Sequence, residues 1–151
     1  EGGVRLDELL ETLTCAATGP IPIRFSLAPE SGVVAALAPE EAVPLALVLN
    51  ELLTNALKHN DSSEPIRPVR LVLETVGDAQ RVAIRNGPAV LPAGFDFAAG
   101  RGLGTGLELL RILLPPQGAT LVFRQEVDEV VAELCLMPPV VCRVEANTVS
   151  R

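Results

Sequence analysis

Hydrophobic side chains recur at helical spacing in three segments of the chain. Residues 4–13 carry apolar side chains every three or four positions, and this pattern predicts a helix that ends before Gly19. A second helix is expected over residues 39–59, where a proline and two acidic residues suit the first turn. A third helix is expected over residues 106–114, because two prolines follow it directly.

Short apolar or alternating runs predict six strands, at residues 21–27, 33–37, 69–76, 81–84, 120–125 and 130–136. The first contains a proline and therefore suits a sheet edge. Gly77 and Asp78 predict a hairpin, whereas residues 60–65 and 88–100 have loop composition, the second as a possible lid. Together these elements predict a two-layer α/β sandwich, in which a mixed, mostly antiparallel sheet packs against about three helices.

The length of 151 residues suits one domain, which we assign to residues 1–138, followed by a loosely ordered tail at 139–151. The net charge is −7 without a basic cluster, which argues against nucleic-acid binding. No apolar run reaches the roughly 18 residues of a membrane span, and no signal peptide is visible. We therefore expect a cytoplasmic domain without direct membrane contact, with its three cysteines reduced.

A polar stripe interrupts the apolar second helix. Glu51, Asn55 and Lys58 lie at i, i+4 and i+7, and this spacing places them on one helix face. A carboxylate, an amide oxygen and an ammonium group suit a magnesium–phosphate site, because Mg²⁺ prefers oxygen ligands and is often completed by substrate phosphates. The alternative is an ordinary solvated stripe. His59, the next residue, suits a helix C-terminus better than a ligand or phosphoacceptor role.

A glycine-rich loop precedes the third helix. Gly102, Gly104 and Gly106 alternate within the segment GRGLGTG at 100–106. Alternate glycines allow close approach of a ligand, and the helix that follows offers free N–H groups to phosphate. A flexible connector is the alternative interpretation.

The two motifs together resemble the ATPase domain of bacterial sensor histidine kinases. The segment LNELLTNALKH at 49–59 resembles the N box of this family, in the form seen in its HWE-like branch. GLGTGL at 102–107 resembles the second glycine box, and NGP at 86–88 stands where the first glycine box is expected. Order and spacing agree over residues 5–138. The resemblance implies the Bergerat fold of the GHKL superfamily, which DNA gyrase and MutL share.

The resemblance also implies roles for the residues that match. Asn55 would bind Mg²⁺, Glu51 would orient water or the acceptor, and Lys58 would contact phosphate. The remaining nucleotide-binding positions would be His59, Arg85, Asn86, Gly87, Arg101, Gly102, Leu103, Gly104, Thr105, Gly106 and Leu107. The implied cofactors are ATP and Mg²⁺, and catalysis would rest on positioning and charge neutralisation.

The first glycine box departs from the family pattern. Family members carry an aspartate there that accepts a hydrogen bond from the adenine amino group, whereas this chain has VAIRNGPAV at 82–90. One alignment puts Arg85 at the aspartate position. Strand alternation favours the other register, in which Val82, Ile84 and Asn86 share a face and Asn86 points into the pocket. An amide oxygen accepts a weaker hydrogen bond than a carboxylate, and one glycine of the box is missing in either register.

Two main functional hypotheses follow. In the first, the chain binds Mg-ATP and phosphorylates a histidine on a separate dimerisation domain, which then serves a response regulator; the chain itself lacks the helical hairpin that carries this histidine. In the second, the altered first glycine box has abolished ATP binding, and the domain is a docking module of a histidine phosphotransferase or pseudokinase. An anti-sigma-type serine kinase is a weaker third, because the N box suits sensor kinases better.

Overall fold

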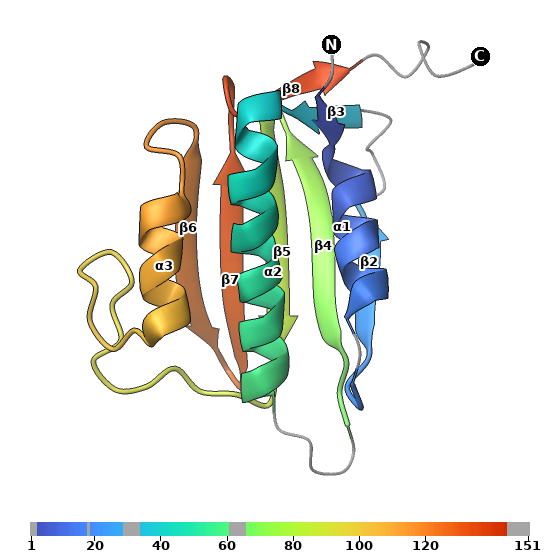
Figure 1. Cartoon of the computed structure of the whole chain (residues 1–151). Coiled ribbons are helices and arrows are strands. Elements are labelled where there is room, and N and C mark those ends of the chain that lie inside the picture. The colour runs from blue at the N-terminus through green and yellow to red at the C-terminus, as the bar shows by residue number, and fades with distance from the viewer. Residues whose placement is uncertain (1–2, 18, 29–33, 61–65, 145–151) are drawn as a thin grey trace.

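A five-stranded sheet carries three helices on one face (Figure 1). The computed structural model describes residues 3–17, 19–28, 34–60 and 66–144. The strands run in the order β2 (Ile23–Leu27), β4 (Val69–Val76), β5 (Ala79–Asn86), β7 (Glu129–Leu136) and β6 (Ala119–Glu126). β2 is parallel to β4 and lies at the sheet edge, and every other neighbouring pair is antiparallel. The predicted α/β sandwich with a mixed sheet is confirmed.

The three predicted helices are present as α1 (Leu6–Ala16), α2 (Ala42–His59) and α3 (Thr105–Leu113). A short 3-10 turn (Pro39–Glu41) leads into α2, with acidic side chains at the positive end of the helix dipole. Lys58 and His59 lie in the last turn, where positive charge is favoured. No helix in the described ranges is both long and apolar enough to cross a membrane.

The core lies between the helices and the sheet, with α2 at its centre (Figure 1). Six side chains of α2 are buried there: Leu45, Val48, Leu49, Leu52, Leu53 and Ala56. They pack against the inward-facing residues of β4 and β5, which alternate as Val69, Leu71, Leu73 and as Val82, Ile84. Burial of the apolar stripe holds α2 against the sheet and therefore fixes the direction of its polar stripe.

A second, small sheet was not expected. β3 (Val34–Leu37) pairs with β1 (Val4–Arg5) on one side and with β8 (Val141–Val144) on the other, in both cases antiparallel. Val140 and Val141 are each only 1% exposed. The expectation of a loosely ordered tail after residue 138 is therefore wrong for residues 140–144, because Val140 and Val141 pack into the core and residues 141–144 form β8. Residues 145–151 and most of the predicted 60–65 loop lie outside the described residues.

The opposite face of the five-stranded sheet carries charge. Arginines and glutamates on neighbouring strands pair there, as Arg81 does with Glu133 at 2.9 Å. Further members of this network are Arg70, Arg85, Arg124, Glu74, Glu126 and Glu129. The sheet is thus apolar toward the helices and polar toward solvent, as expected for a two-layer protein.

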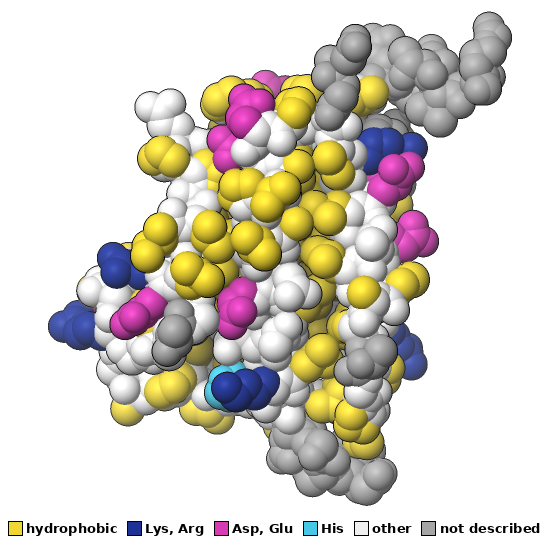
Figure 2. Space-filling view, viewed as in Figure 1, with side chains coloured by type: hydrophobic (Ala, Val, Ile, Leu, Met, Phe, Trp, Pro, Cys, Tyr) yellow, Lys and Arg dark blue, Asp and Glu magenta, His cyan; other side chains and the backbone are white. Residues whose placement is uncertain are grey.

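Part of the helical face is apolar on its outer side as well. Val43 and Leu47 of α2 are 69% and 51% exposed, and Leu109 and Ile112 of α3 are 50% and 78% exposed. Figure 2 shows hydrophobic side chains gathered over these two helices. The polar side chains of α2 begin at Asn50, in the second half of the helix, and the functional site is built there.

Candidate functional site

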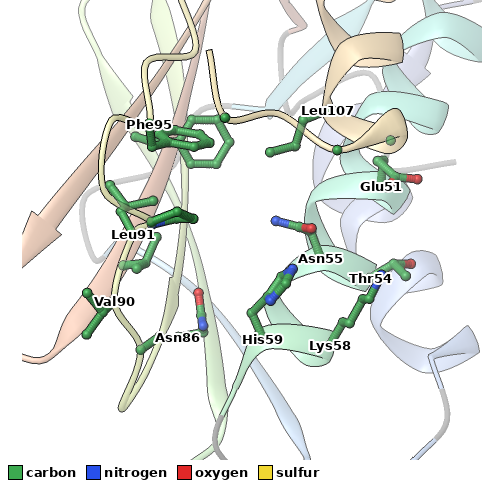
Figure 3. A pocket seen from close by; sticks show the side chains of 17 residues that line it. Glu51, Thr54, Asn55, Lys58, His59, Asn86, Val90, Leu91, Phe95 and Leu107 are labelled. Carbon is green, nitrogen blue, oxygen red and sulfur yellow. The ribbon is translucent and has the colours of Figure 1, made fainter. Parts of the chain in front are cut away.

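A cavity of about 490 Å³ lies between the C-terminal half of α2, the end of β5 and the segment that leads into α3 (Figure 3). This volume is in the range of small-molecule and cofactor sites. Residues from segments that are far apart in the sequence meet in it, and they include both motifs found in the sequence.

The polar stripe of α2 forms one side of the cavity. Glu51, Asn55 and Lys58 all line it, together with Thr54 and His59. Glu51 and Asn55 are half-buried, whereas Thr54, Lys58 and His59 are exposed. Figure 3 shows the Asn55 side chain directed into the cavity from the helix. The carboxylate, the amide and the ammonium group thus line one cavity, as their spacing predicted.

Asn86, the last residue of β5, also lines the cavity and is only 5% exposed. Its neighbours Val82 and Ile84 are buried on the same face of the strand, as alternation predicted. Arg85 lies on the opposite face, where its Nη1 is 2.7 Å from Glu126 Oε1 and 3.5 Å from Glu129 Oε1. The alignment that places Arg85 in the pocket is therefore wrong, because strand alternation turns its side chain to the other face of the sheet.

The glycine loop forms another side of the cavity through Gly102, Gly104 and Gly106. A Cβ atom at Gly106 would collide with Oε2 of Glu51, so the first turn of α3 and the carboxylate occupy adjoining space. Gly102 has a φ of +75°, and a Cβ there would lie 3.2 Å from Cα of Phe95. Glycine therefore permits a close approach at both positions.

Of the other residues predicted to bind the nucleotide, some line the cavity and some do not. Leu107 lines the cavity, and Leu103 packs against the core instead. The Arg101 side chain is 72% exposed and pairs with Asp96 at 3.4 Å. Gly87 lies beside Arg67, whose Nε donates to the Gly87 carbonyl oxygen at 3.2 Å. Leu103, Arg101 and Gly87 are not among the cavity-lining residues.

Thr105 is the first residue of α3, and its side chain lies outside what the structure describes.

An apolar wall faces α2, and the motifs did not predict it. It consists mainly of Val90, Leu91, Phe95, Phe123 and Val130. The Phe95 and Phe123 rings meet edge to face, with their centroids 5.3 Å apart. Aromatic residues in a segment rich in glycine and proline were the available signal, because such rings must pack against something.

Backbone and side-chain hydrogen bonds hold this wall against the β6–β7 hairpin. The Ala89 N–H donates to the Asp128 carbonyl oxygen at 3.0 Å. The Leu91 N–H donates to Oε1 of Gln125 at 2.7 Å, and Nε2 of Gln125 donates to the Ala89 carbonyl oxygen at 3.2 Å. The wall is thus anchored to the sheet.

Asp96 stabilises the turn that leads into the glycine loop. The Ala99 N–H donates to Oδ1 of Asp96 at 3.1 Å, and the backbones of Asp96 and Arg101 exchange two hydrogen bonds of 2.9 Å. The hydrogen bond from Ala99, followed by the interaction with Arg101, lowers the pKa of Asp96 below its ordinary value. The carboxylate is therefore ionised at neutral pH and holds the turn before Gly102.

The chemistry of the lining suits a magnesium nucleotide. Asn55 and Glu51 offer the oxygen donors that Mg²⁺ prefers, and phosphates would complete its coordination. Lys58 offers a positive charge to phosphate, and the N-terminus of α3 offers backbone N–H groups. The apolar wall and the buried Asn86 amide provide a surface and a polar group for a planar base.

Comparison with known proteins gives matches to solved structures. No protein-family model matches the chain, and no curated protein does. The histidine kinase domain of a blue-light activated histidine kinase from Erythrobacter litoralis superposes with a TM-score of 0.63 at 20% identity, covering 87% of this chain. The Acinetobacter baumannii histidine kinase AdeS superposes with a TM-score of 0.68 at 12% identity, covering 91% of this chain.

The chain has the fold of histidine kinase catalytic domains. A further match is the histidine kinase ThkA in complex with the response regulator TrrA, with a TM-score of 0.67 at 16% identity and 87% of this chain covered. The chain spans 56% of the Erythrobacter structure, 66% of AdeS and 40% of the ThkA chain. The histidine kinase fold therefore covers nearly the whole chain, and the relatives carry further segments.

Proposed function

We propose that this chain is the ATP-binding catalytic domain of a two-component sensor histidine kinase of the GHKL superfamily. It would bind Mg-ATP and transfer the γ-phosphoryl group to a histidine on a separate dimerisation domain. The observation that carries the proposal is the meeting of Glu51, Asn55 and Lys58 with the glycine loop in one cavity. The histidine kinase fold supports it.

In this proposal each group acts on charge or position. Asn55 would hold Mg²⁺, which would supply neutralisation of phosphate charge, and Lys58 and the N–H groups of the glycine loop would contact the phosphates. His59 borders the same cavity and would lie near the bound nucleotide. Glu51 orients the imidazole of the acceptor histidine. A nitrogen of this imidazole forms a bond to the γ-phosphorus, while the bond between the γ-phosphorus and the oxygen that bridges to the β-phosphate breaks and ADP leaves.

Two protein partners belong to the proposal. The first is the domain that carries the phosphoacceptor histidine, on the same or another chain. The second is a response regulator receiver domain, which would take the phosphoryl group from that histidine. The complex of the histidine kinase ThkA with the response regulator TrrA supports the second partner.

A second candidate is a docking module that no longer binds ATP. The observation in its favour is the first glycine box, where the neutral Asn86 lines the cavity in place of a carboxylate and Pro88 follows Gly87. Nucleotide affinity distinguishes the two candidates, because only the kinase needs the cavity to bind ATP.

Transfer of label from γ-labelled Mg-ATP tests the proposal. The chain alone should stay unlabelled. When a panel of isolated phosphoacceptor domains of sensor kinases is added, at least one of these domains should become labelled. Glu51→Gln is the matched control, because it keeps the side-chain shape and removes the charge; it should bind nucleotide and retain only residual transfer. Label on His59 of the chain itself would contradict the proposed role.

A further inference from the structure

Asn86 is the buried polar side chain of the cavity. Of the buried polar residues in the described part of the chain, Asn60, Gln80 and Asn86, only Asn86 lines the cavity. The fully buried side-chain atoms without a hydrogen-bond partner in the described residues are Asn60 Oδ1 and Arg67 Nη2, so the Asn86 amide is not sealed in the protein interior. Its amide lines the cavity on a residue that is otherwise buried, so it is expected to hydrogen-bond to what fills the cavity.

The surroundings of Asn86 are suited to a flat ring. Val90 and Leu91 lie on its side of the cavity, and Phe95 lies further along the same wall (Figure 3). The polar side chains Asn55, Lys58 and His59 come from α2, across the cavity. Apolar and aromatic walls bind the face of any base without regard to its edge, and the Asn86 amide is the buried polar group placed on this wall to bind the edge.

An amide offers a donor and an acceptor side by side. Adenine presents an exocyclic N–H donor beside the ring acceptor N1, and Oδ1 and Nδ2 of asparagine match this pair. Guanine presents the reverse order, the acceptor O6 beside the donor N1–H. Rotation of the amide by about 180° exchanges Oδ1 and Nδ2 and matches guanine as well. A carboxylate offers two acceptors and can therefore satisfy only the donor of either pair.

We propose that the cavity accepts adenine and guanine nucleotides alike, and that the Asn86 amide reads the edge of either base by exchanging its donor and acceptor. This inference rests on the proposed function, because it requires a nucleotide in the cavity. It adds that the site selects purine nucleoside triphosphates as a class instead of ATP alone.

Calorimetric titration of the whole chain with three magnesium nucleotides tests the inference: ATP, GTP and purine riboside triphosphate, which lacks the exocyclic group at C6. The dissociation constants for ATP and GTP should agree within about threefold, which corresponds to a smaller difference in binding free energy than one hydrogen bond contributes. Purine riboside triphosphate should bind about fivefold more weakly, since it makes one hydrogen bond fewer. In Asn86→Leu all three should bind with equal, reduced affinity.

The outcomes distinguish a failure of dual recognition from a failure of the proposed nucleotide-binding function. Binding of ATP with GTP more than about tenfold weaker would overturn dual recognition and leave the ATP-binding function intact. An Asn86→Leu variant that keeps the preference over purine riboside triphosphate would also overturn it, because another group would then read the edge. Binding of no nucleotide would overturn both. If a melt without ligand shows that Asn86→Leu does not fold, the three titrations of the unaltered chain still test the inference.

Discussion

Asp96 illustrates how one exposed side chain shapes the approach to the cavity. Its carboxylate accepts the Ala99 N–H in the turn that precedes Gly102. Because the pKa of Asp96 is lowered in the folded chain, the interaction is complete above the unfolded value of 3.8. It is lost only as the pH falls through the lower pKa of the folded state.

We therefore predict that the Ala99 amide resonance shifts as the pH is lowered, with a midpoint below 3.8. A pH series of nitrogen–proton correlation spectra measures this midpoint. Asp96→Ala is the control and should show no such transition at Ala99. A midpoint at or above 3.8 in the unaltered chain would show that the carboxylate does not hold the turn.

At the same scale, the sequence could predict which residues of α2 and β5 reach the cavity. Glu51, Asn55 and Asn86 follow from helical and strand periodicity, which depend only on neighbouring residues. The presence of Leu91 and Phe123 in the cavity could not be predicted, because it depends on contacts between residues that are distant in the sequence, such as Leu91 and Gln125.

At the scale of elements, the contact of α2 with α3 couples the two motifs. The Glu51 carboxylate lies against the first turn of α3, where Gly106 has no side chain. A methyl group at Gly106 would displace the carboxylate, which can rotate away because it ends a flexible side chain. The position of Glu51 therefore depends on this glycine.

Gly106→Ala should consequently impair phosphoryl transfer and spare the fold. We expect the free energy of unfolding to stay within about 1 kcal/mol, since alanine favours a helix by about that amount over glycine. Transfer should fall about 10- to 100-fold, because small displacements of a positioning group are costly. Single-turnover transfer and chemical denaturation measure the two quantities.

A double variant provides the control for Gly106→Ala. In a Glu51→Ala background, the substitution should cause no further loss of transfer, since the displaced group is already absent. Additive losses would show that Gly106 acts independently of Glu51.

In the whole molecule, the first and the last strand belong to the same small sheet. β1 and β8 flank β3, and Val140 and Val141 add to the main core. The sequence did not reveal this arrangement, because β8 pairs with a strand more than a hundred residues away and the prolines before it are typical of a chain end. The main sheet was predictable since most of its strands pair with neighbours in sequence.

Removal of β8 should therefore destabilise the fold. Truncation after Pro139 strips Val140 and Val141 from the core, and truncation after Val144 keeps them. The two truncated chains should differ in free energy of unfolding by roughly 3 kcal/mol or more, the cost of exposing two buried valines. Urea denaturation of both measures the difference. Equal stabilities would mean that β8 contributes nothing.

The most direct test of the account is a thermal melt with and without Mg-ATP, run in parallel on Asn55→Ala. Ligand at about 100 times its dissociation constant adds about 2.7 kcal/mol to the stability. For a domain of this size, that corresponds to a rise of roughly 5–10 °C in the melting temperature. We expect this rise in the unaltered chain and its disappearance in Asn55→Ala. The same melting temperature with and without Mg-ATP would contradict ATP binding and favour the docking module.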